Sequence, residues 1–445
     1  MRLVYFILFF TLKYALRVFY PRQKTVNSPK EFGGRTIYVS NHSASFMDPL
    51  VVASMRNPIV FFMTRSDVFT PISRPLLWAS HMLPIYRQQD GEDTKAKNEE
   101  VFQKCSRILS FGRNLLIFGE GFTDDTFVRR LKPVKKGAVR IGFKTLENIN
   151  WKKNIYIAAV GCNYTFPNKM RSGILISTSD KICLNEYRKE YEENPNKVIA
   201  DITKRVEELM QEQITHVEDM ENTSLHENIM IFSRRGMNAN NFDRKNSLLS
   251  RWKYSKSLAK WINKEDIESN EKLSEFKKGA ESYFSLLKRV KLEERLLFWK
   301  INNPGGSRMK ELFTMIALTP LAILGVLHLG LPYIIVKRFV EKSFKRDVFY
   351  GSVKLIVGMI AMGLVNIPVI FLFHAYAYPS WGLAILYYFM IGIFGLCAYV
   401  WMLNFRDFKA KGIVAKTDTS KFEKKRAELI ETLKTAVPTE FHPHG

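Results

Sequence analysis

The chain has 445 residues, 46% of them hydrophobic, and a formal net charge of +24. This length allows one large domain with extensions, or two to three domains, with apolar surface left over for a bilayer. The charge favours anionic lipid surfaces or phosphorylated molecules; nucleic acid is the weaker alternative, since no zinc-finger or RRM pattern accompanies it.

The cysteines are few and dispersed. None of the four forms a Cys-x-x-Cys pair, so the sequence indicates neither a zinc site nor a redox dithiol. They stand at positions 105, 162, 183 and 397, among apolar neighbours, as expected of buried thiols in a reducing compartment.

The first 30 residues are predicted to form a membrane-anchoring segment. Residues 3–20 read as an apolar helix that is barely long enough to span a bilayer and is interrupted by Lys13 and Arg17. An anchor lying in the membrane plane is therefore favoured over a spanning helix. A cleaved signal peptide is the alternative, although no small-residue cleavage site follows the apolar run.

Residues 31–230 alternate short apolar runs with amphipathic stretches, which predicts an α/β domain with a mixed central sheet flanked by helices. The predicted strands are 36–40, 58–63, 114–118, 154–160 and 173–178. The predicted helices are 94–111, 134–148 and 197–216.

Residues 231–306 are rich in Lys and Glu, with tryptophans such as Trp252 and Trp261 between the charges. This pattern indicates a helical insertion. One interpretation is an amphipathic helix pair that packs on the core; the other is an arm on the membrane surface, where Trp and Lys are both favoured.

Residues 307–408 are predicted to form a membrane domain. Three runs, 312–336, 355–378 and 381–403, have spanning length, and the last two form a hairpin. Basic residues cluster in 337–354 and again from Arg406, which the positive-inside rule places in the cytoplasm. A cytoplasmic catalytic domain then requires 312–336 to dip into the membrane and return. Residues 409–445 would be a cytoplasmic tail.

The stretch from Asn41 to Pro49 is the best candidate for chemistry. It places His42 and Asp48 six residues apart after a short strand, in a turn that Pro49 prevents from being helical throughout. The carboxylate can hold one ring nitrogen while the other takes a proton from a substrate hydroxyl. No Ser or Cys stands in a nucleophile-elbow context, so a bound alcohol would attack directly. His81 has no carboxylate close in sequence and is interpreted as structural.

Three further blocks follow in order. The first is Leu83-Pro84-Ile85-Tyr86-Arg87, in which Arg87 suits bidentate phosphate binding, or else makes a surface salt bridge. The second is Ile117-Phe118-Gly119-Glu120-Gly121, in which Glu120 either contacts a ligand or stands exposed in a tight turn. The third is the strand end Ala158 to Tyr164.

Together these blocks resemble the glycerophospholipid acyltransferase superfamily over about residues 30–215. The six-residue His42–Asp48 spacing and the Arg87 and Glu120 blocks are most similar to the glycerol-3-phosphate/dihydroxyacetone-phosphate acyltransferase branch. Gly119, Phe122 and Ala159 depart from the family pattern, which leaves acceptor choice open.

The resemblance implies a glycerolipid acyltransferase fold, with His42 as general base and Asp48 orienting it. Asn41 and the Gly119–Glu120–Gly121 segment would help to bind the acceptor, Thr123 could supply a hydroxyl, and Lys135 could add to the phosphate field unless it is simply solvated. No metal or cofactor is expected; acyl-CoA or acyl carrier protein is the co-substrate.

The expectation is an integral membrane O-acyltransferase, its catalytic domain facing the cytoplasm, that acylates glycerol-3-phosphate or dihydroxyacetone phosphate in phospholipid biosynthesis. The expected partners are the bilayer, the acyl donor and the glycerol-phosphate acceptor, without nucleic acid. The first alternative is a 1-acyl-glycerol-3-phosphate (lysophosphatidate) acyltransferase. A distant alternative is a non-catalytic membrane scaffold, which would leave the four blocks unexplained.

Overall fold

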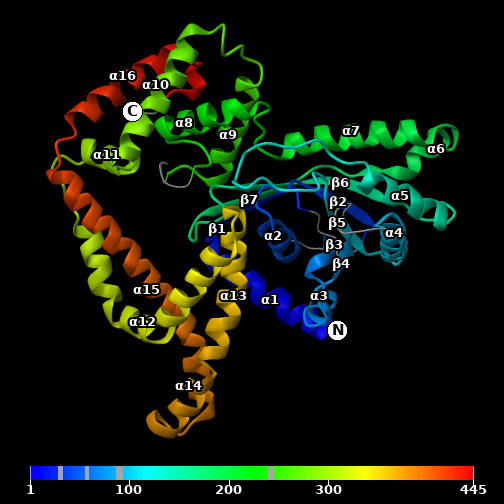
Figure 1. Ribbon diagram of the computed structural model, residues 1–445, viewed down its shortest axis with the longest axis horizontal. Helices are drawn as coiled ribbons and strands as arrows, with labels where there is room; N and C mark the ends of the chain where they lie inside the picture. Colours follow the sequence, from blue (N-terminus) through cyan, green and yellow to red (C-terminus); the bar gives the residue numbers. More distant parts are fainter. Residues whose placement is uncertain (1, 29–33, 56–59, 87–93, 239–244, 444–445) are drawn as a thin grey trace. The chain divides into compact units, whose positions relative to one another are not determined.

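The computed structural model describes residues 2–28, 34–55, 60–86, 94–238 and 245–443 (Figure 1). The chain divides into two compact units. The first, called the sheet unit below, comprises Met1–His226, Arg235–Ala239 and Asp243–Lys264. The second, called the helical unit, comprises Glu227–Arg234, Asn240–Phe242 and Glu265–Gly445.

The described part of the sheet unit contains an eight-stranded mixed sheet in the order β1-β7-β6-β2-β5-β3-β4, with β8 paired to β6. Pairing is parallel except where β6 meets β7 and β8. The strands are β1 (Arg22–Val26), β2 (Thr36–Ser40), β3 (Val60–Arg65), β4 (Met82–Ile85), β5 (Asn114–Phe118), β6 (Tyr156–Tyr164), β7 (Gly173–Thr178) and β8 (Ile182–Cys183). The mixed α/β sheet confirms the predicted fold class.

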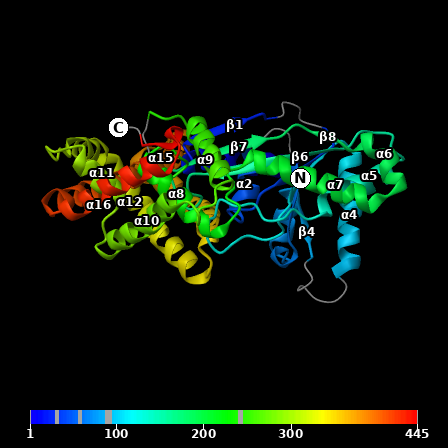
Figure 2. The same cartoon turned by 90° about the horizontal axis from the view of Figure 1, so that it is seen from above.

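Helices cover both faces of this sheet. The apolar stripes of α4 (Thr94–Ser110), α5 (Gly137–Asn148) and α7 (Pro195–Gln213) form one core with β2 and β6. Helices α1 (Arg2–Phe19) and α2 (Met47–Met55) pack on each other and lie on the other side of the sheet from α7 (Figures 1 and 2). The shorter helices are α3 (Arg74–Ala79) and α6 (Arg188–Glu193).

The predicted 231–306 insertion is divided between the two units. Helix α8 (Thr223–Ser233) leads from the first unit into the second, and α9 (Leu248–Ile262) returns to the sheet unit. There Trp252 packs with Leu175 and Met237, because the apolar face of α9 completes the cover of β7. Trp252 is therefore a core residue of the sheet unit, as the helix-packing interpretation expected, and not part of a membrane-surface arm.

The predicted cytoplasmic tail is also folded. In the helical unit α10 (Glu271–Arg289) packs against α16 (Ser420–Ala436), which begins four residues after the end of α15 (Trp381–Lys416). Leu429 and Leu433 are buried, and Arg426 donates to Glu294 of α11 (Glu294–Ile301) at 2.6 Å. Residues 409–445 therefore include a helix held by an apolar stripe and an ion pair, while their place in the cytoplasm stays a prediction.

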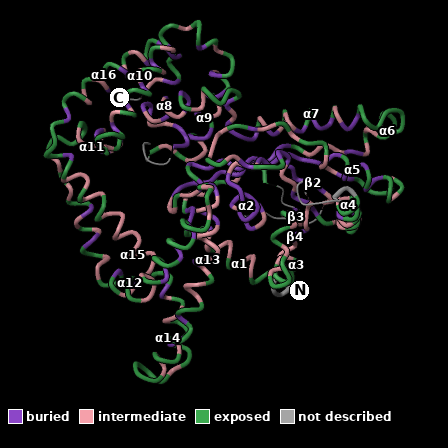
Figure 3. The backbone as a smooth tube through the Cα atoms, in the orientation of Figure 1, coloured by how far each residue is buried: buried purple, intermediate pink, exposed green. Residues whose placement is uncertain are grey.

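Three stretches of the helical unit, Met309–Ser343, Asp347–Ala377 and Trp381–Lys416, are long and apolar enough to cross a membrane. They comprise α12 (Met309–Ser343), α13 (Tyr350–Val365), α14 (Ile367–Leu372) with a π-helical turn (Phe373–Ala377), and α15. Their side chains are largely exposed, in contrast to the buried strands (Figure 3).

Helix α12 is bent (Figure 1). Its first half pairs with α15, where Trp401 Nε1 donates to Thr319 Oγ1 at 3.1 Å, and its second half pairs with α13, where Lys354 lies 2.7 Å from Glu341. Pro332 lies within the helix and removes the amide that would bond the carbonyl of His328. This bend fits the predicted dip and return of 312–336, whose membrane topology stays a prediction.

Candidate active site

The parallel register brings two of the predicted blocks together. Ser40, the last residue of β2, lies beside Phe118 of β5 and Val160 of β6. His42 and Glu120 each follow two residues after these paired strand ends, so they meet at the carboxyl edge of the central strands. This edge is where open α/β sheets commonly hold their ligands.

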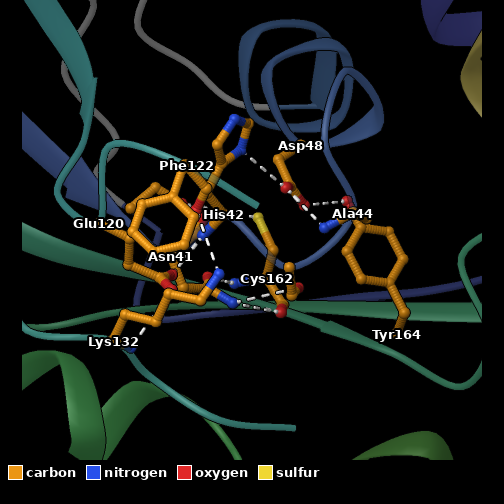
Figure 4. Close-up of polar contacts among 11 residues, drawn as sticks. Asn41, His42, Ala44, Asp48, Glu120, Phe122, Lys132, Cys162 and Tyr164 are labelled. Atoms are coloured by element: carbon orange, nitrogen blue, oxygen red, sulfur yellow. Dashed lines mark hydrogen bonds and ion pairs between the residues drawn. The ribbon is translucent and has the colours of Figure 1, made fainter. Parts of the chain in front are cut away.

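His42 and Asp48 face each other across the turn between β2 and α2. His42 Nδ1 lies 3.1 Å from Asp48 Oδ2, and the second ring nitrogen points away from the carboxylate (Figure 4). Asp48 and Pro49 occupy the first turn of α2, where proline is tolerated because that amide has no intrahelical acceptor. The Asp48 side chain is fully buried, whereas 21% of the His42 side chain is exposed.

Two more donors hold the Asp48 carboxylate. The Ala44 amide donates to Oδ2 at 2.8 Å, and the Tyr164 hydroxyl donates to Oδ1 at 2.8 Å (Figure 4). Burial, together with the charge of Asp48, raises the pKa of Tyr164 well above its ordinary value, so the hydroxyl stays protonated. A buried carboxylate needs such donors, and here they fix its orientation toward His42.

Glu120 joins the His42 turn to the loop after β5. Its Oε1 accepts from the His42 amide at 2.6 Å and its Oε2 from the Lys132 amide at 3.2 Å (Figure 4). Only 2% of Glu120 is exposed, which excludes the exposed-turn interpretation. Burial raises the pKa of Glu120, opposed by these two amides. Each oxygen thus accepts from a backbone amide, which positions the two turns, and the acceptor contact that the resemblance implied stays a prediction.

Asn41 likewise bonds to the sheet. Its side-chain oxygen accepts from the Cys162 amide at 2.8 Å, and its nitrogen donates to the Cys162 carbonyl at 3.2 Å (Figure 4). These bonds fasten the turn to β6, and Asn41 is buried. The His42 ring also stacks on Phe118, with ring centroids 4.3 Å apart. The bonds to Cys162 give Asn41 a place in holding the turn, and its contact with the acceptor stays a prediction.

Gly119 and Gly121, on either side of Glu120, are suited to their positions for different physical reasons. A Cβ at Gly119 would lie 2.9 Å from Val39 Cγ1 and 3.0 Å from Val134 Cγ1, so no side chain fits without displacement. Gly121 has φ +76°, a left-handed conformation that glycine adopts without strain. Its Cβ position would lie 2.9 Å from Lys135 Nζ, which places the Lys135 ammonium directly over this loop.

Two predicted residues of the site remain, Thr123 and Arg87. Thr123 is buried, and the neighbouring Asp124 pairs with Lys132 at 3.0 Å. Lys132 Nζ also lies 4.1 Å from the centroid of the Phe122 ring. Arg87 lies outside the described residues; β4, which precedes it, ends at Ile85, at the same carboxyl edge as β2 and β5.

Metal ligation has no candidate in the described ranges, where no group of three or more His, Cys, Asp or Glu side chains is placed to hold an ion. The chemistry that the described side chains can perform is proton transfer at His42. With Nδ1 beside the Asp48 carboxylate, the imidazole is oriented to accept a proton at Nε2, and the carboxylate stabilises the resulting imidazolium.

Sequence reasoning did not identify two residues of this site. Tyr164 stands in the fourth block, and a tyrosine within a buried strand needs a partner for its hydroxyl. That signal was present, but the partner, Asp48, is 116 residues away in the chain. Phe118 carried no comparable signal, since a strand-end aromatic residue is usually a core residue.

Comparison with known proteins gives a family match over part of the chain. Residues 20–163 match the Acyltransferase family. No curated protein matches the chain significantly. Among solved structures the chain is similar to the 1-acyl-sn-glycerophosphate (LPA) acyltransferase PlsC from Thermotoga maritima, with 17% sequence identity and a TM-score of 0.32, covering 46% of this chain and 80% of that one. The family match over residues 20–163, which contain His42, Asp48 and Glu120, shows an acyltransferase domain and so an acyl-transferring enzyme.

Proposed function

We propose that this enzyme transfers a fatty acyl group from acyl-CoA or acyl carrier protein to a hydroxyl of glycerol-3-phosphate or dihydroxyacetone phosphate. His42 Nε2 removes the hydroxyl proton, and the oxygen attacks the thioester carbonyl. The tetrahedral intermediate then collapses, the C–S bond breaks, and the thiol leaves with the proton held on His42.

The observation that carries the proposal is the His42–Asp48 pair at the carboxyl edge of β2. The imidazole is partly exposed, while its orienting carboxylate is buried and held by three donors. Such preorganisation allows the general base to act without reorganising at the moment of reaction. No nucleophilic side chain is needed, because the acceptor supplies the attacking oxygen.

The six-residue spacing supports the choice of a glycerol-3-phosphate-type acceptor, on the resemblance to that branch. Ser45 adopts a left-handed conformation in this turn, with φ +51°. Across the turn the Asp48 carboxylate accepts from the Ala44 amide and lies beside His42 Nδ1. The longer turn is thus compatible with an intact base.

The acceptor phosphate requires cationic ligands. Lys135 is the described candidate, because its ammonium lies against Gly121 and its amide donates to the Gly119 carbonyl at 2.9 Å. Arg87 is proposed as the bidentate partner, on its sequence position after β4. The remaining amides of the 41–45 turn, those of Ser43 and Ser45, are the candidates for the oxyanion.

The proposal is tested with full-length protein in lipid nanodiscs, by crossing two donors with three acceptors. The donors are acyl-CoA and acyl carrier protein; the acceptors are glycerol-3-phosphate, dihydroxyacetone phosphate and 1-acyl-glycerol-3-phosphate. We expect the highest kcat/KM with glycerol-3-phosphate. His42→Ala should lower turnover at least about 100-fold, as loss of a general base does.

The matched control is His442→Ala, which replaces a histidine of the helical unit and should leave turnover unchanged. A preference for 1-acyl-glycerol-3-phosphate would replace the proposed acceptor by the lysophosphatidate alternative. Activity confined to amine- or sugar-bearing lipids would overturn the phosphate argument, and undiminished turnover of His42→Ala would remove His42 as the base.

A further inference from the structure

Residues 131–135, called the cationic segment below, join the loop after β5 to α5 without regular secondary structure. Two lysines of this segment lie beside the site. Lys132 is paired with Asp124 at 3.0 Å. Lys135 is exposed, with its ammonium over Gly121, so a phosphate can approach it. Because the segment has no helix or strand bonds, other groups must hold its backbone if Lys135 is to have a fixed position.

Every backbone amide of the cationic segment donates to an acceptor, and its remaining residue, Pro133, has no amide hydrogen. Two of the acceptors come from α7 and the residues that follow it. The Leu131 amide donates to His216 Nδ1 at 3.0 Å, and the Val134 amide donates to Glu207 Oε2 at 2.8 Å. The acceptors for the other two amides are Glu120 Oε2 at 3.2 Å and the Gly119 carbonyl at 2.9 Å.

Glu207 and His216 are themselves held in place. Glu207 lies on α7, whose apolar stripe is buried in the core of the sheet unit. Beyond the end of α7, the His216 carbonyl accepts from Asn263 Nδ2 at 2.9 Å, and the Val217 amide donates to the Arg129 carbonyl at 2.9 Å. Burial lowers the pKa of His216, so the ring is neutral at pH 7 and carries its proton on Nε2 while Nδ1 accepts.

We propose that Glu207 and His216 are positioning residues, which hold the cationic segment so that Lys135 meets the phosphate of the acceptor. This role rests on the proposed function, in which Lys135 binds that phosphate. Both side chains act through backbone amides and not on the reacting atoms. If the segment is released, a smaller fraction of the enzyme holds Lys135 in place, and the apparent affinity for the acceptor falls with that fraction. The effect should therefore appear in the KM for the acceptor more than in kcat.

The test uses full-length protein in lipid nanodiscs and compares the removal of each acceptor with its conservative replacement. His216→Leu and Glu207→Met remove the acceptors, whereas His216→Asn and Glu207→Gln each keep an oxygen that can accept from the same amide. The matched control is Glu208→Met, at the next residue of α7, which pairs with Arg205 at 3.3 Å on the surface. Hydrogen exchange at 131–135, measured by mass spectrometry, reports whether the segment is held. Steady-state kinetics with glycerol-3-phosphate gives KM and kcat.

His216→Leu and Glu207→Met should each speed hydrogen exchange at 131–135 and raise the KM for the acceptor at least about 2-fold, the smallest effect expected of one lost hydrogen bond. The two conservative variants and Glu208→Met should stay close to the wild type in both measurements. The positioning role is overturned if exchange at 131–135 is unchanged in His216→Leu and Glu207→Met. It is also overturned if kcat falls in these variants while the KM for the acceptor does not rise.

Lys135→Ala distinguishes a failure of this role from a failure of the proposed function. This variant should raise the KM for glycerol-3-phosphate without changing the exchange that His216 and Glu207 control. An unchanged KM in Lys135→Ala would overturn the phosphate role of Lys135. A raised KM in Lys135→Ala, with an unchanged KM in His216→Leu and Glu207→Met, would keep the phosphate role and overturn the positioning role.

Discussion

The Tyr164 hydroxyl determines how the Asp48 carboxylate shares its charge. It donates to Oδ1, while His42 Nδ1 and the Ala44 amide share Oδ2. Tyr164 does not reach the reacting atoms, so it acts as a positioning residue. A donor to the carboxylate also withdraws charge that would otherwise stabilise the His42 imidazolium. Loss of the hydrogen bond from Tyr164 to Asp48 should therefore affect both the orientation and the basicity of His42.

Tyr164→Phe should lower kcat/KM about 10- to 150-fold, the range that corresponds to about 1.5–3 kcal/mol for one hydrogen bond to a charged group. The same variant should raise the apparent pKa of the acidic limb of the pH–rate profile, because Asp48 would carry more charge toward His42. A merely structural role would lower activity without moving this limb. Steady-state kinetics between about pH 5 and 9 separates the two outcomes, with Tyr156→Phe, at the opposite end of β6, as the matched control.

Glu120→Gln tests the second support of the base. The two carboxylate oxygens accept from the amides of His42 and Lys132, whereas a glutamine presents one oxygen and one NH2 group. One of the two amides would then face the NH2 group and lose its acceptor. The free energy of unfolding should fall by about 1–3 kcal/mol, the penalty for a buried unsatisfied group. We expect lower thermal stability together with a loss of kcat. Glu120→Gln with unchanged kcat would show that this link does not position His42.

The sequence could predict the parts of the site that are local in the chain. His42 and Asp48 lie six residues apart in one turn, so their pairing followed from spacing and residue type. The contacts that Asn41 and Tyr164 make with partners more than 100 residues away depend on strand order, which a single sequence does not determine. Glu120 could be selected from its Gly-flanked position, but its hydrogen bonds to the backbone arise from the register of β2 and β5.

Asn366 has an identifiable function in the bend of α12. Its Nδ2 donates to the His328 carbonyl at 3.4 Å, the group that lacks its helical donor because of Pro332. His328 Nε2 also lies 2.9 Å from the Tyr387 hydroxyl of α15. Polar groups among apolar helices need such partners, since lipid offers none. The bend is therefore stabilised from both neighbouring helices.

A double-mutant cycle tests this function. Asn366→Leu should lower the free energy of unfolding in detergent by about 0.5–2 kcal/mol, the range for a hydrogen bond between apolar helices. Pro332→Ala restores an amide that can bond to the His328 carbonyl. In the Pro332→Ala background, Asn366→Leu should therefore lower the free energy of unfolding by less than it does in the wild type. Equal costs in both backgrounds would mean that Asn366 does not serve this carbonyl.

The His81 ring stacks between Tyr5 of α1 and Phe61 of β3, so the packing of α1 on the sheet unit should depend on pH. Burial, with a smaller effect from Arg113, lowers the pKa of His81 from 6.5 to about 4, and burial lowers that of His226 to about 3. Between about pH 6.5 and 4 the unfolded chain binds protons that the folded chain does not. The free energy of unfolding should therefore fall as the pH is lowered through this window.

Thermal melts of the full-length protein should show a lower Tm at pH 5 than at pH 7. His81→Asn, which tolerates the left-handed φ of +61°, should reduce this difference, because it removes one of the histidines whose pKa is lowered by burial, the others being His216 and His226. An identical difference in wild type and His81→Asn would exclude His81 as a contributor. His442→Asn serves as the control, because His442 belongs to the helical unit and not to the sheet unit that holds His81.

Apolar runs predicted the central strands because these strands are buried on both faces. The missed strands lack that signal: β1 (Arg-Gln-Lys-Thr-Val) is a polar edge strand, β4 is four residues long and contains Pro84, and β8 has only two residues. Helix α2 was missed because Pro49 suggested a turn, although proline is compatible with the first turn of a helix. Long periodic helices such as α7 were placed to within about three residues.

Across the whole chain, charge and hydropathy predicted an α/β part followed by apolar helices, but not the assignment of each helix to a unit. Helices α9 and α16 have similar Lys-rich amphipathic sequences, yet α9 packs on β7 and α16 on α10. Their partners lie far away in the chain, so only the tertiary fold decides between them. The three apolar runs were recognised because their length and composition are sufficient signals without tertiary contacts.

The bend of α12 leads to a prediction about topology. Its first half runs antiparallel to α15, from the Glu311–Lys411 pair at 2.7 Å to the His328–Tyr387 contact, and its second half runs antiparallel to α13. Both ends of α12 should then lie on the side of the bilayer that holds the end of α15. The basic residues from Lys337 to Lys354 favour the same side, because positive charge is retained in the cytoplasm.

Single cysteines introduced by Lys345→Cys, Lys416→Cys and Pro379→Cys, in sealed membrane vesicles of one known orientation, test this topology. A membrane-impermeant maleimide should label positions 345 and 416 from the same side, and position 379, in the turn between α14 and α15, only from the other side. Lys345 is exposed just after the end of α12, so its labelling does not require unfolding. Labelling of 345 together with 379 would instead make α12 a complete span, and the bend would then have to be accommodated within the thickness of the bilayer.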